Sequence, residues 1–132
     1  MRIFMLATGV VGLCACATAS EPAQRSTKAQ ATYDRMLSGK VAGKAEKCLP
    51  TYRSNDMTII DDDTILFRDG RTVYVNQPLG GCQSLSRSGS ALVTRNIGPQ
   101  LCRGDLATVV DNTSGMTLGA CSLGDFVPYR KS

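Results

Sequence analysis

The chain has 132 residues, a net charge of +4 and no histidine or tryptophan, and aromatic residues make up 5% of it. This length suits one domain of about a hundred residues once a leader is removed, and so few large rings favour a small core held by covalent cross-links. The positive charge is too mild for a nucleic-acid-binding protein, so we expect no nucleic-acid partner.

Residues 1–19 have the anatomy of a signal peptide. Arg2 supplies the positive charge, an uncharged and mostly apolar run follows from Ile3 to Leu13, and small residues end the segment. The run is shorter than the roughly 20 apolar residues that span a bilayer, so it predicts a cleaved leader and not a membrane anchor. We therefore expect an exported protein.

Two cleavage sites compete within this leader. Leu13-Cys14-Ala15-Cys16 resembles the bacterial lipobox, although Cys14 is unusual at its position, and it predicts that Cys16 is lipidated. Ala17-Thr18-Ala19 is an ordinary signal-peptidase site that would leave Ser20 as the first residue. We favour lipidation of Cys16. Ala17 is not the Asp associated with inner-membrane retention, so the periplasmic side of the outer membrane is the expected address.

Residues 20–47 are rich in Ala, Lys, Gln, Ser and Gly, which is typical of a tether. Within this segment, 27–37 contains good helix formers. Tyr33, Met36 and Leu37 recur at i, i+3 and i+4, and Ser38-Gly39 follows. The pattern predicts a short amphipathic helix ahead of the main domain, 48–132.

Short runs rich in Ile, Val, Thr, Tyr and Phe follow Cys48, separated by Asp, Asn and Gly clusters. These runs indicate antiparallel strands. We expect about seven of them, at 56–60, 64–68, 71–76, 91–95, 106–111, 116–120 and 125–129. The predicted fold is mainly β, a small antiparallel β-barrel or compact sandwich with a short N-terminal helix.

The clearest local signal is a hairpin with Asp69-Gly70 in a type I′ turn. This turn sets Leu66 opposite Val73 and Ile65 opposite Tyr74. Ile65, Phe67 and Tyr74 then share one face, while Leu66, Val73 and Val75 share the other. A hairpin that is apolar on both faces is expected to lie between two layers.

The same turn brings two basic residues together. Arg68 and Arg71 would face each other beside Asp69-Gly70, where like charges repel unless an anion intervenes. We therefore predict an anion-binding site at Arg68 and Arg71, with a tolerated solvated pair as the alternative.

Four cysteines remain after either cleavage: Cys48, Cys82, Cys102 and Cys121. An even number in an exported domain indicates two disulfides, with three connectivities open. We predict Cys48 with Cys121, to close the sheet, and Cys82 with Cys102, to hold the loop 77–90. The cysteines lack C-x-x-C spacing and the chain has no histidine, so we expect no metal site.

Several short motifs accompany these cysteines: Arg53-Ser54, the run from Ile60 to Leu66, Gly81-Cys82, the run from Leu101 to Asp105, and Cys121-Ser122-Leu123. In this order they resemble a family of small exported bacterial proteins of unknown function with four cysteines in the mature domain. The resemblance covers about residues 48–129. It implies an extracytoplasmic β domain and no particular activity.

The sequence lacks the usual motifs of nucleophilic catalysis. Without histidine there is no Ser–His or Cys–His pair, and neither G-x-S-x-G nor S-x-x-K occurs. The run Asp61–Asp63 is best explained as a turn. We therefore expect a non-catalytic envelope protein, without cofactor, that binds an envelope component or a partner protein. The alternatives are an exported hydrolase inhibitor acting through the loop 77–90 and an Asp-dependent hydrolase.

Overall fold

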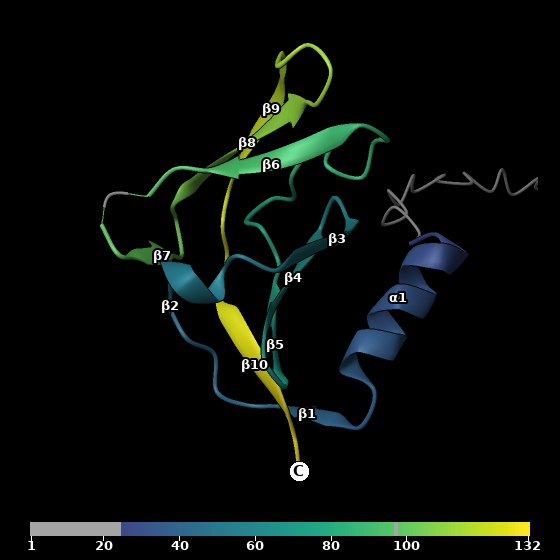
Figure 1. The fold of residues 1–132 in the computed structure, drawn as a ribbon, viewed down its shortest axis with the longest axis vertical. Helices are drawn as coiled ribbons and strands as arrows, with labels where there is room; N and C mark the ends of the chain where they lie inside the picture. Colours follow the sequence, from purple (N-terminus) through teal and green to yellow (C-terminus); the bar gives the residue numbers. More distant parts are fainter. Residues whose placement is uncertain (1–24, 97) are drawn as a thin grey trace, which may run out of the picture.

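The fold is mainly β, as predicted. The computed structural model describes residues 25–96 and 98–132, which form one helix, a 3-10 turn at Thr51–Arg53 and ten strands in three antiparallel sheets (Figure 1). No sheet in this part of the chain closes into a barrel, so the sandwich-like alternative is the correct one. The strands are β1 (Lys40–Ala42), β2 (Cys48–Pro50), β3 (Met57–Asp61), β4 (Thr64–Asp69), β5 (Thr72–Asn76), β6 (Ser90–Thr94), β7 (Gln100–Cys102), β8 (Leu106–Asp111), β9 (Thr117–Ser122) and β10 (Phe126–Lys131).

Helix α1 (Thr27–Leu37) has the bounds that the sequence predicted. The hydroxyl of Ser26 accepts a hydrogen bond from the backbone N–H of Ala29, which caps the N-terminus. The helix ends before Gly39, whose φ of +69° suits a residue without a Cβ. Among the described residues, no helix is long and apolar enough to cross a membrane.

The five-stranded sheet has the order β1-β10-β5-β4-β3 and lies between two layers. One face packs against α1, with Leu66, Val73 and Val75 beneath Tyr33 and Met36. The opposite face carries Ile65, Phe67 and Tyr74, as predicted. It packs against the three-stranded sheet β6-β8-β9 and the ribbon β2-β7.

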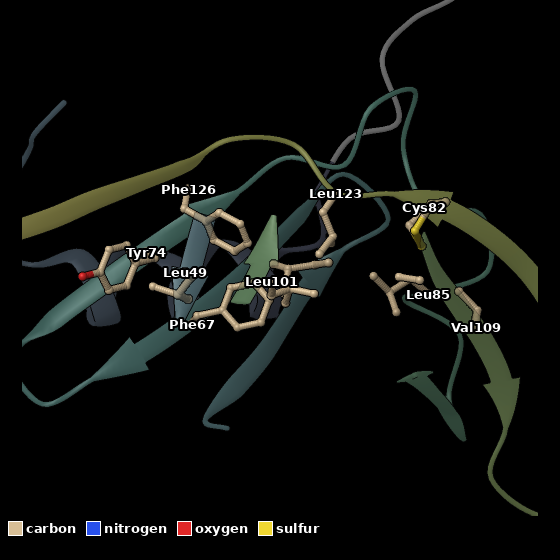
Figure 2. Packing of buried hydrophobic residues seen from close by; sticks show 12 residues of the cluster. Leu49, Phe67, Tyr74, Cys82, Leu85, Leu101, Val109, Leu123 and Phe126 are labelled. Atoms are coloured by element: carbon tan, nitrogen blue, oxygen red, sulfur yellow. A yellow bond between two sulfur atoms is a disulfide. The ribbon is translucent and has the colours of Figure 1, made fainter. Parts of the chain in front are cut away.

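The main core lies between these sheets and consists almost entirely of apolar side chains. Figure 2 shows Leu49 and Leu101, from β2 and β7, beside Phe67 of β4, with Leu85 and Val109 toward the three-stranded sheet. All of these side chains are at most 2% exposed. The rings of Phe67 and Phe126 pack with their centroids 5.6 Å apart. Burial of these side chains therefore sets how the β4-β5 hairpin packs against β2, β7 and the three-stranded sheet.

The hairpin register differs from the predicted one by two residues. Phe67 faces Tyr74 and Arg68 faces Val73, so the two loop residues are Gly70 and Arg71. Only Gly70 of these two has a positive φ, whereas the predicted type I′ turn needs positive φ at both of its central residues. A shift of two preserves the faces of a strand, which is why the predicted faces are correct and the predicted partners are wrong.

The predicted disulfide connectivity is also wrong. Cys48 is bonded to Cys102, its register partner in the ribbon β2-β7, and Cys82 is bonded to Cys121. The three-residue strands β2 and β7 carry little sequence signal, so their pairing was not expected. A bridge between Leu79 and Ser122 brings the loop 77–90 beside β9, within reach of Cys121.

Much of the expected tether is folded onto the domain. In addition to α1 it contributes β1, which pairs with β10, and Glu46, which exchanges backbone hydrogen bonds with Phe126. The guanidinium of Arg25 bonds to Asp61 at 2.6 Å and to the Thr64 hydroxyl at 3.0 Å. The leader, Cys16 and Ser20 lie outside the described residues.

Candidate functional site

A shallow groove of about 550 Å³ lies where the end of α1, the β4-β5 hairpin and the β1-β10 pair meet. We call it the basic groove. Five of its eight lining residues are cationic, and no carboxylate is among the described residues that line it. The lining residues are Arg35, Met36, Lys40, Arg68, Gly70, Arg71, Val73 and Lys131.

The fold brings these cations together from four separate parts of the chain. Arg35 stands in the last turn of α1, and Lys40 begins β1. Lys131 ends β10 and is the register partner of Lys40, so two lysines face each other across an antiparallel pair. Like charges at facing positions destabilise a sheet unless a counter-charge lies between them.

Arg68 and Arg71, the predicted anion-binding pair, both line this groove, although they do not face each other. Arg68 is bonded to the carboxylate of Asp56, with nitrogen–oxygen distances of 2.7 and 2.9 Å. Asp69, beside the turn, is instead 3.2 Å from Arg53. Asp56 and Asp69 are thus paired with other arginines. Arg71 takes part in none of the four ion pairs formed by residues 25–96 and 98–132.

The other groove cations are equally unneutralised. Arg35, Lys40 and Lys131 also take no part in the ion pairs formed within the described chain. Met36 and the nearly buried Val73 supply the apolar part of the groove lining. Several cationic donors around one solvent-filled hollow favour an anion with several acceptor oxygens, such as a phosphate or a carboxylate.

The Asp61–Asp63 run forms the predicted turn between β3 and β4. Asp61 accepts from the backbone N–H of Asp63, and Asp62 accepts from the backbone N–H of Ser86 at 2.7 Å. The run therefore holds the loop 77–90 against the sheet. Leu85 of that loop is 2% exposed and Cys82 is fully buried, so the centre of the loop belongs to the core.

Sequence reasoning identified two of the five groove cations and missed Arg35 and Lys131 as members of the site. Lys40 lies in the segment 20–47, which the composition predicted to be a tether and not part of a binding site. The convergence of Arg35, Lys40 and Lys131 depends on the β1-β10 pairing and on the position of the helix end. A three-residue edge strand gives little periodicity from which to predict that pairing.

Fold and site together define a small, disulfide-linked, sandwich-like β domain with a basic groove at one end. Its two disulfides indicate an oxidising compartment outside the cytoplasm. Comparison with protein-family models, curated proteins and solved structures finds no match. The resemblance to small exported proteins with four cysteines therefore remains a prediction.

Proposed function

We propose that this protein is a non-catalytic module of the bacterial cell envelope that binds an anionic envelope component through the basic groove. Its leader directs export, and lipidation of Cys16 anchors it to the periplasmic side of the outer membrane. The supporting observation is the concentration of Arg35, Lys40, Arg71 and Lys131 around one hollow without a carboxylate.

The placement of cations around the basic groove favours the binding of an anion. The facing pair Lys40 and Lys131 costs sheet stability, and Arg71 adds a third unneutralised cation at the turn. A bound anion offsets this repulsion and gains charge-assisted hydrogen bonds. An anion in the groove would therefore stabilise the folded domain as well as bind to it.

The anchor makes the groove accessible to envelope components. Ten chain steps lead from Cys16 to the helix cap Ser26 and reach at most about 33–36 Å when extended, whereas the helix itself is about 16 Å long. A domain tethered at Cys16 can thus present the groove at the far end of α1 either to the same membrane or to the wall above it.

Replacing Cys16 tests the anchor separately from the groove. Cys16→Ser should release the protein from the membrane fraction into the soluble periplasm. Mass spectrometry of the wild-type N-terminus should show an acylated Cys16. A mature N-terminus at Ser20 would refute the anchor.

Co-sedimentation of the Cys16→Ser protein with isolated envelopes tests the groove. Each removed cation weakens attraction to an anionic surface by about 1 kcal/mol, so Arg71→Gln with Lys131→Gln should reduce binding about thirtyfold at low salt. The matched control is Lys28→Gln with Arg87→Gln, which removes the same charge outside the groove. Equal binding by both double variants would exclude the basic groove.

A further inference from the structure

A second hollow lies on the same face of the five-stranded sheet. It has a volume of about 300 Å³, and we call it the tyrosine groove because Tyr33 of α1 and Tyr129 of β10 line it. The other lining side chains that matter here are Gln77, Leu79, Arg103 and Asp125. This hollow combines aromatic surface with hydrogen-bonding groups.

The two grooves are neighbours along the β5-β10 pair. Val73 lines the basic groove and Tyr129 lines the tyrosine groove, and these two residues are register partners. Facing residues in an antiparallel pair have Cβ atoms about 5 Å apart. Lys131 follows Tyr129 by two residues and so projects on the same face of β10. The two hollows therefore adjoin along this strand pair, and an elongated ligand that reaches both passes over Tyr129, because Val73 is buried.

The tyrosine groove offers both apolar contact and hydrogen bonds. Leu79 is 45% exposed at its edge. Burial, and then the neighbouring hydroxyl of Tyr129, raise the pKa of Tyr33. The amide of Gln77 is exposed, and Arg103 and Asp125 form an ion pair at 2.8 Å with further donor and acceptor positions.

This combination suits a saccharide better than a fatty chain or a simple ion. A pyranose ring has apolar C–H faces, which pack on the half-buried Tyr129 and the exposed Leu79, and a rim of hydroxyl groups, which need both donors and acceptors. A simple phosphate would leave the tyrosine groove unused. A fatty chain would take the water from the exposed ion pair and from the amide of Gln77 and offer no hydrogen bond in exchange.

We propose that the two grooves form one site for an anionic saccharide, with the anionic group in the basic groove and an adjoining sugar ring in the tyrosine groove. This inference rests on the proposed function and specifies its ligand. The same chemistry can come from a phosphorylated glycolipid headgroup or from a free anionic polysaccharide.

Calorimetry of the Cys16→Ser protein with three probes tests the proposal: inorganic phosphate, a phosphorylated disaccharide and the same disaccharide without phosphate. The phosphorylated disaccharide should bind at least about tenfold more tightly than either of the others, because one or two net hydrogen bonds give that factor. Vesicles displaying the same disaccharide phosphate as a headgroup then distinguish the sources. Stronger binding to vesicles than to the free sugar assigns the ligand to the membrane, and equal binding assigns it to the free polymer.

Variants separate the two halves of the site. Gln77→Ala with Tyr129→Phe should remove the advantage of the disaccharide over phosphate while leaving phosphate affinity unchanged. Arg71→Gln should weaken both phosphate-bearing probes. The matched control is Gln83→Ala with Tyr52→Phe, two exposed positions outside both grooves. It should change neither the affinity for phosphate nor the advantage of the disaccharide.

Two results would overturn the proposal in distinguishable ways. Equal affinity for phosphate and the phosphorylated disaccharide would refute the saccharide and leave the proposed function standing. Absence of binding to every phosphate-bearing probe, together with loss of charge-dependent envelope binding, would refute the proposed function itself.

Discussion

The side chain of Asn76 exchanges two hydrogen bonds with the backbone of Gly124, donating to its carbonyl oxygen at 2.8 Å and accepting from its N–H at 3.0 Å. Asn76 is fully buried at the end of β5. Gly124 leaves no room for a Cβ, because that atom would overlap the carbonyl oxygen of Gln77. This pair fixes the entry into β10, the strand that carries Tyr129 and Lys131.

Asn76→Ala is therefore expected to destabilise the domain by about 2–4 kcal/mol, since it leaves a buried N–H and a buried carbonyl of Gly124 without partners. Urea unfolding under oxidising conditions measures the change. Asn55→Ala, which removes an exposed amide, serves as the control and should cost little. A loss below about 0.5 kcal/mol for Asn76→Ala would show that the pair is dispensable.

The disulfide pairing gives a second prediction. Non-reducing peptide mapping should link Cys48 to Cys102 and Cys82 to Cys121. Sequence separations of 54 and 39 correspond to about 4 kcal/mol of loop-closure stabilisation for each bond. A mild reductant should open Cys48–Cys102 first, because both of these residues are half-buried whereas Cys82 and Cys121 are buried. Preferential opening of Cys82–Cys121 would contradict the burial argument.

Arg25 gives a third prediction, because it fastens the start of α1 to the sheet. Its guanidinium contacts Asp61 and Thr64 and stacks on Tyr33, 4.5 Å from the ring centroid. Arg25→Ala should accelerate amide hydrogen exchange in α1 while exchange in β8 stays unchanged, since local opening of the helix needs no global unfolding. Equal acceleration in both elements would show that the contact stabilises the whole domain.

The β8-β9 turn gives a prediction about pH. Backbone N–H groups of Ser114 and Thr113 donate to Asp111 and lower the pKa of its carboxyl below 3.8. A carboxylate with a lowered pKa in the folded state contributes stability above its ordinary pKa, and this contribution is lost as pH falls through the folded value. Asp111→Asn should therefore reduce stability at neutral pH and flatten its acid dependence below about pH 4. Acid melts of both proteins measure this, and parallel curves would refute it.

The fold was predictable where local signals are strong. Helix α1 has clear periodicity, and the two apolar faces of the β4-β5 hairpin follow from its alternation. The predicted hairpin partners were wrong because Asp69-Gly70 is a strong turn signal. In the structure Asp69 pairs with Thr72 instead, so the turn moves on by one residue to Gly70 and Arg71. β1, β2 and β7 have only three residues each, too few for a period to show.

The site was predictable only in part, and for a related reason. Arg68 and Arg71 are close in sequence, so a turn prediction was enough to bring them near each other. Lys40 and Lys131 are separated by almost the whole domain and meet only through the β1-β10 register. Charges gathered by long-range pairing leave no local pattern in the sequence.

The most direct test of the central claim is a titration of the isotope-labelled Cys16→Ser protein with inorganic phosphate, followed by amide NMR at constant ionic strength. We predict shift changes confined to the basic groove, in the end of α1, in Lys40, in Gly70–Thr72 and in Lys131, and their loss in the Arg71→Gln, Lys131→Gln variant. Shift changes centred on the separate hollow around Arg95 and Leu106, or none at all, would contradict the assignment of the basic groove as an anion site.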